Sequence, residues 1–366
     1  MNSSVSRSTF IAHYIRIYGP QCICCEADAE TSFHYLFSQE SDHHDSVCDL
    51  YQCSHCHFAI TAPILSETAC MNLYSSDYTQ MPTGVLGFND DKPAELFPAA
   101  GFLQKMNRKI YHDLFPRIFC TNCRWHSIIR PFLFSRWFSK FFIGFPYYFK
   151  GTPTRMTRPR ILDCGTGQGR FIALFPPNSA FEISGIDINP AAIDFCRHYR
   201  LPVEKGDLRT CTKSGFAFIR LWHVLEHVAN PVEYIRAAHD KLEKDGVLIL
   251  GLPLFNPWTY RVVLSFLPIQ VWLHLPFHRF HWNLNNIKRM LIKNGFSVIS
   301  ARSKSSGSWK TMTLSYNLGR RRRASSYSLP KFLETFLQVV WFFLDIPLDF
   351  LNGGDTMEIY ARKVDL

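Results

Sequence analysis

The stretch Ile161-Leu-Asp-Cys-Gly-Thr-Gly-Gln-Gly-Arg-Phe171 decides the fold of this 366-residue chain. Its first residues read as a short buried strand. Gly165, Gly167 and Gly169 then follow where the chain must turn tightly into a helix. Glycine allows a positive φ and lets the backbone approach a ligand closely. Alone, such a loop also fits an ordinary tight turn, so the sequence around it has to decide between the two interpretations.

Short apolar runs alternate with amphipathic runs downstream of the loop, which is typical of βαβ units around a parallel sheet. The predicted strands cover residues 160–163, 181–187, 202–207, 216–221, 246–252, 296–302 and 356–362. One predicted helix begins at residue 170, and the others cover 190–197, parts of 224–242 and 284–293. Gly295 after the last helix is a C-cap signal. If the strands 296–302 and 356–362 pair, the connection between them is far longer than an ordinary loop, which predicts an insertion.

Acidic residues follow the first three predicted strands. Asp187 ends the second strand, where a carboxylate can accept both hydroxyls of a ribose. Asp163 lies two residues before the first glycine, where it would repel a pyrophosphate but suits an ammonium group. Asp207 follows Gly206, either beside a base or as a turn residue. A ligand with a ribose, a base and a cationic amino acid is therefore expected, and S-adenosylmethionine fits.

Four motifs in order resemble those of class I S-adenosylmethionine-dependent methyltransferases. They are the glycine stretch, Gly185-Ile-Asp-Ile-Asn-Pro190, Gly206-Asp207 and His223-Val-Leu-Glu-His227. The resemblance covers residues 158–302 and the last strand. It implies an α/β, Rossmann-like sheet of order 3-2-1-4-5-7-6 with an antiparallel last strand. One departure is Phe216-Ala217, where family members often have Phe-Asp.

The resemblance also implies where the cofactor is held. The glycine loop and Asp163 would hold its methionine end, Asp187 its ribose, and Asp207 would lie by its adenine amine. Trp222 would flank the adenosine, although core packing explains it equally well. The predicted cofactor-binding residues are Asp163, Gly165, Gly167, Gly169, Asp187, Ile188, Asp207, Leu208 and Trp222.

His223, Glu226 and His227 are candidates for the chemistry. If helical, their i, i+3, i+4 spacing puts them on one face after the fourth strand. Methyl transfer needs alignment and can need proton removal from the acceptor, which suits a histidine. Two alternatives remain. The pair Glu226–His227 would only cap and orient the helix, or the segment would bind a divalent metal as in ubiquinone-pathway O-methyltransferases, although His223 replaces their first Glu. His281, before the 284–293 helix, is a further acceptor-side candidate.

Two C-x₂-C pairs near the N-terminus predict a structural zinc on Cys22, Cys25, Cys53 and Cys56. Tyr51-Gln-Cys53 reads as a strand entering the second knuckle. A four-thiolate site is closed, so its expected role is to fold a small module. The rival ligands are Cys24, His43, His44, His55 and His57, whereas Cys120 and Cys123, near His126, are interpreted as a reduced helical pair.

The N-terminal part resembles that of a subset of bacterial methyltransferases of saccharide and secondary-metabolite pathways, with a zinc-ribbon-like module and a Tyr-x-x-x-Tyr stretch, here Tyr74 to Tyr78. This implies a saccharide or other small-molecule acceptor. The predicted domains are a zinc-ribbon-like module (1–80), an aromatic and basic helical connector (81–158) and a methyltransferase domain (159–366) with insertions at 254–282 and 303–355.

Composition limits the class of protein. Hydrophobic residues make up 47% and charged residues 19%, which excludes a disordered chain. The net charge of +10 favours anionic partners. The N-terminus lacks the apolar run and cleavage site of a signal peptide, and no apolar stretch long enough to span a membrane is free of charge or Pro. We therefore expect a cytoplasmic protein whose cysteines are reduced or bound to metal.

Three segments are more apolar than the core fold needs: Phe132–Phe149, Val262–Leu275 and Phe332–Phe350. Together with Lys304, Lys310 and the Arg320–Arg323 run, they predict peripheral contact with an anionic bilayer at the inner membrane face, and therefore a lipid-linked acceptor. Packing as a lid or a dimer interface is the alternative.

Two other functions compete with a saccharide or small-molecule methyltransferase. The zinc ribbon and the basic run allow an RNA methyltransferase, but the aromatic residues lie in apolar blocks, which disfavours nucleic acid. The second competing function is that of a non-catalytic zinc-containing scaffold. The intact glycine loop with Asp163 and Asp187 argues against it.

Overall fold

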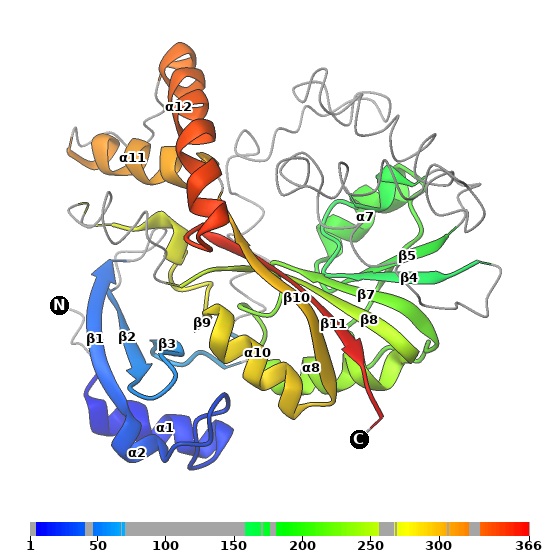
Figure 1. Ribbon diagram of the computed structural model, residues 1–366, viewed down its shortest axis with the longest axis horizontal. Helices are drawn as coiled ribbons and strands as arrows, with labels where there is room; N and C mark the ends of the chain where they lie inside the picture. Colours follow the sequence, from blue (N-terminus) through cyan, green and yellow to red (C-terminus); the bar gives the residue numbers. More distant parts are fainter. Residues whose placement is uncertain are drawn as a thin grey trace. The chain divides into compact units, whose positions relative to one another are not determined.

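The computed structural model describes residues 5–40, 47–66, 68–69, 158–169, 171–175, 181–255, 267, 269–305, 307–321 and 330–365. The chain divides into two compact units, and Figure 1 labels their helices and strands. Unit 1 comprises Met1–Cys70, His223–Ile235 and Leu250–Ala361, and unit 2 comprises Met71–Trp222, Arg236–Ile249 and Arg362–Leu366.

A seven-stranded sheet carries the fold. Its strands, in chain order, are β4 (Arg160–Cys164), β5 (Glu182–Asp187), β6 (Val203–Lys205), β7 (Phe216–Trp222), β8 (Leu242–Pro253), β10 (Phe296–Lys304) and β11 (Thr356–Lys363). They are arranged β10-β11-β8-β7-β4-β5-β6, and β4 runs parallel to β5 and β7. The predicted Rossmann-like order is confirmed, because the last strand in sequence, β11, lies between the fifth, β8, and the sixth, β10.

Three helices follow the predicted alternation: α7 (Pro190–His198), α8 (Pro231–Lys241) and α10 (Leu284–Lys293). Asn189 caps α7 by accepting a hydrogen bond from the backbone N–H of Ala191. Asn283 begins α10 with a reciprocal capping box to Asn286. The prediction of a helix over 284–293 is confirmed, and α10 packs against β10 (Figure 1).

The helix expected to begin at Arg170 differs from the prediction. Among described residues 171–175, the chain makes one 3₁₀ turn, η7 (Ile172–Leu174), and Phe175 is already extended at φ −101° and ψ 127°. The sequence continues with Pro176-Pro177. A residue before proline is disfavoured in the α region, which explains why the helix stops after one turn.

A second sheet is built around the N-terminal segment. It has four strands in the order β1 (Phe33–Glu40), β2 (Val47–Cys53), β3 (Ala59–Ala62) and β9 (Phe280–His281). Two helices precede β1, α1 (Arg7–Tyr18) and α2 (Ala29–Ser32). The expected strand at Tyr51–Cys53 is confirmed as the end of β2. The last strand, β9, comes from the distant segment before α10, so this sheet is closed by long-range pairing.

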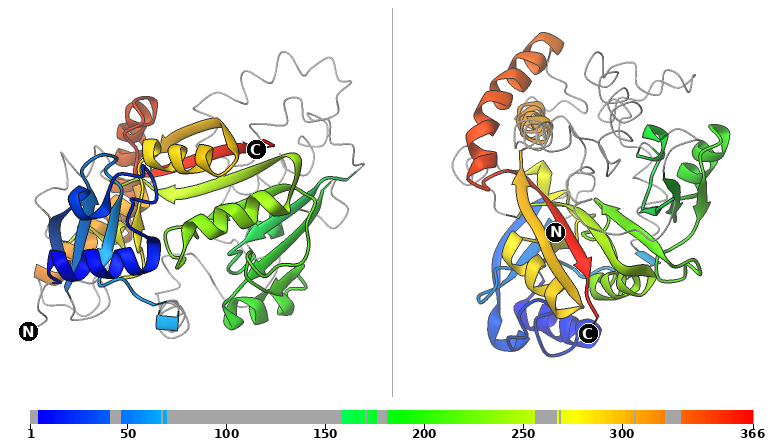
Figure 2. Two further views of the ribbon diagram at one scale, coloured as in Figure 1. Left: turned by 90° about the horizontal axis from the view of Figure 1, so that it is seen from below. Right: turned by 45° about the vertical axis from the view of Figure 1, so that its right-hand side comes forward.

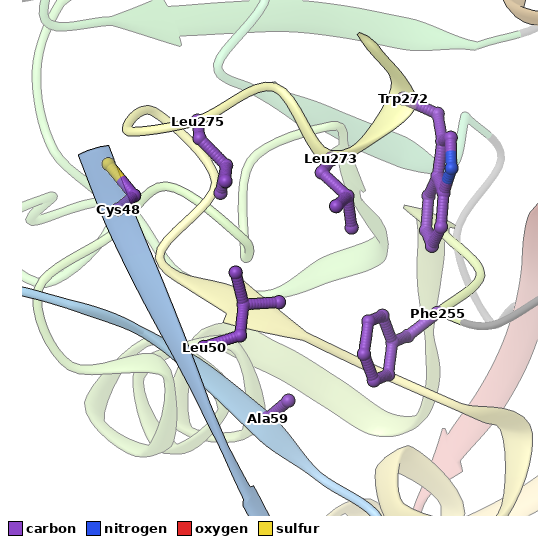
Figure 3. Close-up of a cluster of buried hydrophobic side chains, with 7 residues drawn as sticks. All are labelled: Cys48, Leu50, Ala59, Phe255, Trp272, Leu273 and Leu275. Atoms are coloured by element: carbon purple, nitrogen blue, oxygen red, sulfur yellow. The ribbon is translucent and has the colours of Figure 1, made fainter. Parts of the chain in front are cut away.

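Buried apolar side chains fix the N-terminal sheet to the chain segment that precedes β9. In Figure 3, Leu50 of β2 and Ala59 of β3 lie near Leu273 and Leu275, and all four are fully buried. Burying each of the three leucine side chains stabilises the contact by about 1.5–3 kcal/mol. The complete cluster is Cys48, Leu50, Ala59, Phe255, Trp272, Leu273 and Leu275.

The long connection between β10 and β11 contains two helices, α11 (Gly307–Arg321) and α12 (Lys331–Phe350), which pack on each other (Figure 1 and Figure 2). The Lys310 ammonium is fully buried, 2.5 Å from Asp345 and 3.0 Å from Asp355. Within the described parts of the chain, no helix has the length and apolar character to cross a bilayer. The apolar segment 132–149 and the last two residues of the Arg320–Arg323 run lie outside the described residues.

Candidate cofactor, acceptor and metal sites

The glycine loop follows β4 in unit 2. Gly165, Gly167 and Gly169 have φ values of 69°, 54° and 72°, a region that L side chains rarely adopt. A Cβ at Gly169 would lie 2.5 Å from Leu201 Cδ1, so this glycine is also needed for packing. A Cβ at Gly167 would meet nothing within 4 Å. The loop is therefore packed at one end and faces open space at Gly167, where a ligand can approach the backbone.

Asp187 ends β5 and is held by the loop. Its Oδ2 accepts a hydrogen bond from the Gly167 N–H at 2.7 Å, and its Oδ1 accepts one from the Asn189 N–H at 2.8 Å. Burial raises the pKa of Asp187, although these hydrogen bonds oppose the shift. Each carboxylate oxygen keeps a second lone pair. The oriented carboxylate is therefore able to accept two hydroxyls, and its predicted role in binding a ribose stays a prediction. The neighbouring Ile188 is 36% exposed.

Asp163 has partners inside the protein. Its carboxylate is 1% exposed, with Arg220 Nη1 at 2.7 Å and the Thr166 hydroxyl at 2.8 Å. The Arg220 guanidinium lies over the rings of Phe171 and Trp222, at 4.4 Å and 4.6 Å from their centroids. The pair therefore holds the loop against β7, and the expected contact of Asp163 with a ligand ammonium stays a prediction. Sequence reasoning missed Arg220, whose signal is a single charge in an otherwise apolar strand.

The predicted adenine-side residues have protein partners as well. Arg209 donates to Asp207 from Nε at 3.1 Å, from Nη2 at 3.0 Å and from its backbone N–H at 2.8 Å. The Leu208 side chain is fully buried. Trp222 packs on Arg220. Roles for these three residues in binding adenosine stay predictions.

The segment after β7 is a turn rather than a helix. The His227 N–H donates to the Val224 carbonyl at 3.0 Å, and α8 begins only at Pro231. The helical interpretation of the His223–His227 spacing is therefore wrong. His223 is in the left-handed region at φ 53°, and its N–H donates to the Gly251 carbonyl at 2.9 Å. This backbone conformation prevents a helix at His223 but still brings its side chain to Glu226.

Three imidazoles surround the Glu226 carboxylate in unit 1. The Glu226 side chain is fully buried, and its Oε1 lies 3.1 Å from His223 Nδ1, 3.9 Å from His227 Nε2 and 4.0 Å from His278 Nε2. His227 Nδ1 is 3.0 Å from the Phe277 carbonyl, which places its proton there. Burial lowers the pKa of both His227 and His278, which keeps them neutral at neutral pH. We call His223, Glu226, His227 and His278 the histidine cluster.

The structure brings His278, rather than the expected His281, to this cluster. His281 is buried and lies 2.8 Å from the Thr61 hydroxyl, and burial lowers its pKa to about 3. His281 lies in β9, whereas His278 precedes that strand by two residues, and the sequence does not show which of them turns toward Glu226. Glu226, His227 and His278 each offer one atom within 4.8 Å of the others, a spacing at which these three groups could hold a metal ion.

The four predicted zinc ligands, Cys22, Cys25, Cys53 and Cys56, lie together, with all Sγ atoms within 4.8 Å of one another. The Sγ atoms of Cys22 and Cys56 are 3.7 Å apart, as are those of Cys25 and Cys53. A tetrahedral zinc with Zn–S bonds near 2.3 Å requires sulfur–sulfur distances of about 3.8 Å. The donor set therefore fits zinc. Of the rival ligands, His43 and His44 lie outside the described residues, and Cys24, His55 and His57 are not in the group. The predicted reduced pair of Cys120 and Cys123 also lies outside the described residues.

Comparison with known proteins agrees with this geometry. Residues 139–301 match the family model of a methyltransferase domain. The seven-stranded sheet has the Rossmann-like fold of class I methyltransferases. Methyltransferases of this class use S-adenosylmethionine, and the placement of that cofactor at the glycine loop and Asp187 stays a prediction. No curated protein matches the chain.

Solved structures of S-adenosylmethionine-dependent methyltransferases resemble the chain distantly. The one from Thermotoga maritima is 15% identical over 57% of this chain and 84% of its own, with a TM-score of 0.38. The one from Archaeoglobus fulgidus is 19% identical over 56% and 86%, with a TM-score of 0.37. The one from Methanosarcina mazei is 14% identical over 57% and 94%, with a TM-score of 0.37. Likeness at this level gives no information about the acceptor.

Proposed function

We propose that this methyltransferase methylates a hydroxyl of a saccharide, lipid-linked or other small-molecule acceptor, with His223 as general base. The observation that carries the proposal is the His223–Glu226 pair. The His223 side chain is 34% exposed, and its Nδ1 lies 3.1 Å from a fully buried carboxylate. An anion at Nδ1 fixes the proton there and leaves the lone pair on Nε2, which is the arrangement of a histidine base held by an acid.

S-adenosylmethionine, when bound, supplies an electrophilic methyl group on a sulfonium. The acceptor oxygen forms a bond to the methyl carbon, the C–S bond breaks with its electron pair going to sulfur, and the acceptor proton passes to His223 Nε2. Glu226 stabilises the imidazolium that forms. His223 directly follows β7, and β7 pairs with β4, the strand that enters the glycine loop, so chain connectivity supports a role for His223 in the same reaction.

The exposed aromatic side chains of α12 support peripheral contact with an anionic membrane. Phe332, Phe336 and Phe343 are 76%, 60% and 65% exposed, and their spacing puts them on one side of the helix. The basic residues at 320–323 precede α12 in sequence. Aromatic side chains beside a basic cluster suit the surface of an anionic bilayer, where a lipid-linked acceptor would be located.

Flotation with liposomes tests this contact. Wild type should float with vesicles containing phosphatidylserine at low salt, and the double variant Phe336→Ser/Phe343→Ser should not. A matched control is Ile292→Ser, which removes an apolar side chain of α10 that is 61% exposed. If the aromatic variant floats like wild type, a lid or dimer interface replaces the membrane contact.

We also propose that zinc occupies the four-cysteine site. The thiol distances support a tetrahedral ion, and the module around it is small. Its structural role is to hold the two knuckles that flank α2, β1 and β2, since so short a segment buries little apolar surface of its own.

Transfer of tritiated methyl groups tests the acceptor class. Purified protein is incubated with labelled S-adenosylmethionine and, separately, with a butanol extract of lipid-linked glycans, free oligosaccharides or total RNA. We expect label in a glycan fraction, and a decrease of about 10²–10⁴-fold in turnover for His223→Asn. His239→Asn is the control, because His239 lies in unit 2 and pairs with the Val364 carbonyl. Label in RNA alone would overturn the proposal, as would normal turnover by His223→Asn.

A further inference from the structure

The histidine cluster and the four-cysteine module are connected through β9. The β3–β9 ladder pairs Ala59 with His281 and Ile60 with Phe280. The ladder begins three residues after Cys56, the last zinc ligand in sequence. On its other side, β9 begins two residues after His278. The strand pair therefore connects the metal knuckle to a member of the histidine cluster over a very short length of chain.

Thr61 is the residue in β3 that contacts this connection with its side chain. Its hydroxyl donates to the His278 carbonyl at 2.7 Å, and the same oxygen lies 2.8 Å from His281 Nε2. A hydroxyl has one proton, so Thr61 must accept the second hydrogen bond from His281. The Thr61 side chain is 3% exposed, so both bonds are shielded from water.

Backbone hydrogen bonds continue from Thr61 to Glu226. The Thr61 N–H donates to the Arg279 carbonyl at 2.9 Å, and the Arg279 N–H donates to the Glu226 carbonyl at 2.9 Å. Thr61 thus fixes the chain at the His278 carbonyl and directly after it, through its hydroxyl and through its amide.

Two contacts tie the cysteine knuckle to the chain after β9. The Asn283 side chain donates to the Cys56 carbonyl at 3.1 Å. The Phe58 ring packs on Trp282, with centroids 4.6 Å apart, and Trp282 is fully buried. Movement of the second knuckle would therefore displace β9 and the start of α10 together.

We propose that Thr61 is a positioning residue for methyl transfer, through which the four-cysteine module holds His278 against Glu226. The cysteine module then does more than fold the N-terminus, because the geometry of the histidine cluster depends on it. The activity part of this inference rests on the proposed function, whereas the placement of His278 does not.

The test compares Thr61→Val, which keeps the shape but removes the hydroxyl, with the control Thr61→Ser, which retains it. Diethylpyrocarbonate modifies accessible neutral imidazoles, and mass spectrometry reports each site separately. His278 and His281 are 3% and 4% exposed, so they react only after local opening. Loss of two buried hydrogen bonds should raise their modification rates roughly 10- to 100-fold in Thr61→Val. The rates in Thr61→Ser, and at His239 in all variants, should stay at wild-type values.

Two further measurements keep the test decisive. S-adenosylmethionine affinity, measured by calorimetry, should be unchanged in Thr61→Val, which shows that unit 2 is intact. If Thr61→Val does not fold, metal removal from wild type by a chelator should raise modification of His278 and His281 relative to His239. Unchanged rates at His278 in the folded variant, or after confirmed metal removal, would overturn the proposal.

A double-mutant cycle tests the route. If Thr61 acts through His278, Thr61→Val should lower methyl transfer in the wild-type background and add little in a His278→Gln background. Additive losses would contradict the route through His278. Absence of methyl transfer in wild type would instead count against the proposed function, and the modification experiment would still decide the placement of His278.

Discussion

Replacing Asp187 with alanine should weaken S-adenosylmethionine binding by a predictable amount. The two carboxylate oxygens are oriented by the N–H groups of Gly167 and Asn189, so both are positioned to accept ribose hydroxyls. Hydrogen bonds to a charged acceptor contribute about 1.5–3 kcal/mol each when lost, and part of this is recovered by water. A net loss of about 2–3 kcal/mol corresponds to an affinity reduced roughly 30- to 150-fold.

Isothermal titration calorimetry on wild type and Asp187→Ala measures this loss directly. Asp187→Asn retains one acceptor oxygen and should lose less affinity than the alanine variant. Asp194→Ala is the matched control, because Asp194 lies on α7 in the same unit, is 71% exposed and pairs only with Arg197 at 3.1 Å among the described contacts. Wild-type affinity in Asp187→Ala would refute the assignment of this carboxylate to the ribose.

Three further predictions concern stability and metal content. Gly169→Ala should lower the free energy of unfolding by about 2–4 kcal/mol, because its Cβ clashes at a positive φ. Gly167→Ala should lower the free energy of unfolding by only about 1–2 kcal/mol, but it should also lower cofactor affinity. Denaturant titration measures the first effect and calorimetry the second. Wild type should contain one zinc per chain by elemental analysis, and full zinc in Cys53→Ser would contradict the site. Lys310→Met removes the buried ammonium that lies between Asp345 and Asp355 and should lower the free energy of unfolding by about 3–5 kcal/mol. Unchanged denaturation would exclude a stabilising role for Lys310.

The strands and helices of the main sheet were predictable because local patterns specify them. The glycine loop marks the first turn, apolar runs mark the buried strands, and Gly295 marks the end of α10, whose bounds agree with the prediction. Methyltransferase motifs then imply the order of strands, which no single run determines. Boundaries differ by a few residues, as at β8, where pairing extends the strand beyond its apolar centre.

The features that were not predictable depend on contacts between distant segments. Pairing of β3 with β9 joins residues more than 200 positions apart, and neither strand has a pattern that specifies its partner. The Asp163–Arg220 pair is similar, since each residue alone suggests an exposed charge or a ligand contact. The choice between His278 and His281 depends on how a two-residue strand turns, which Thr61 decides through its hydrogen bonds.

A crystal structure of the protein with S-adenosylhomocysteine tests the central claim most directly. The account predicts that the ribose hydroxyls lie within about 3 Å of the two Asp187 oxygens, with the amino-acid portion of the ligand along the loop from Gly165 to Gly169. Ligand density away from this loop, or a ribose that contacts other groups while Asp187 keeps only its backbone partners, would contradict the assignment of the cofactor site and with it the proposed reaction.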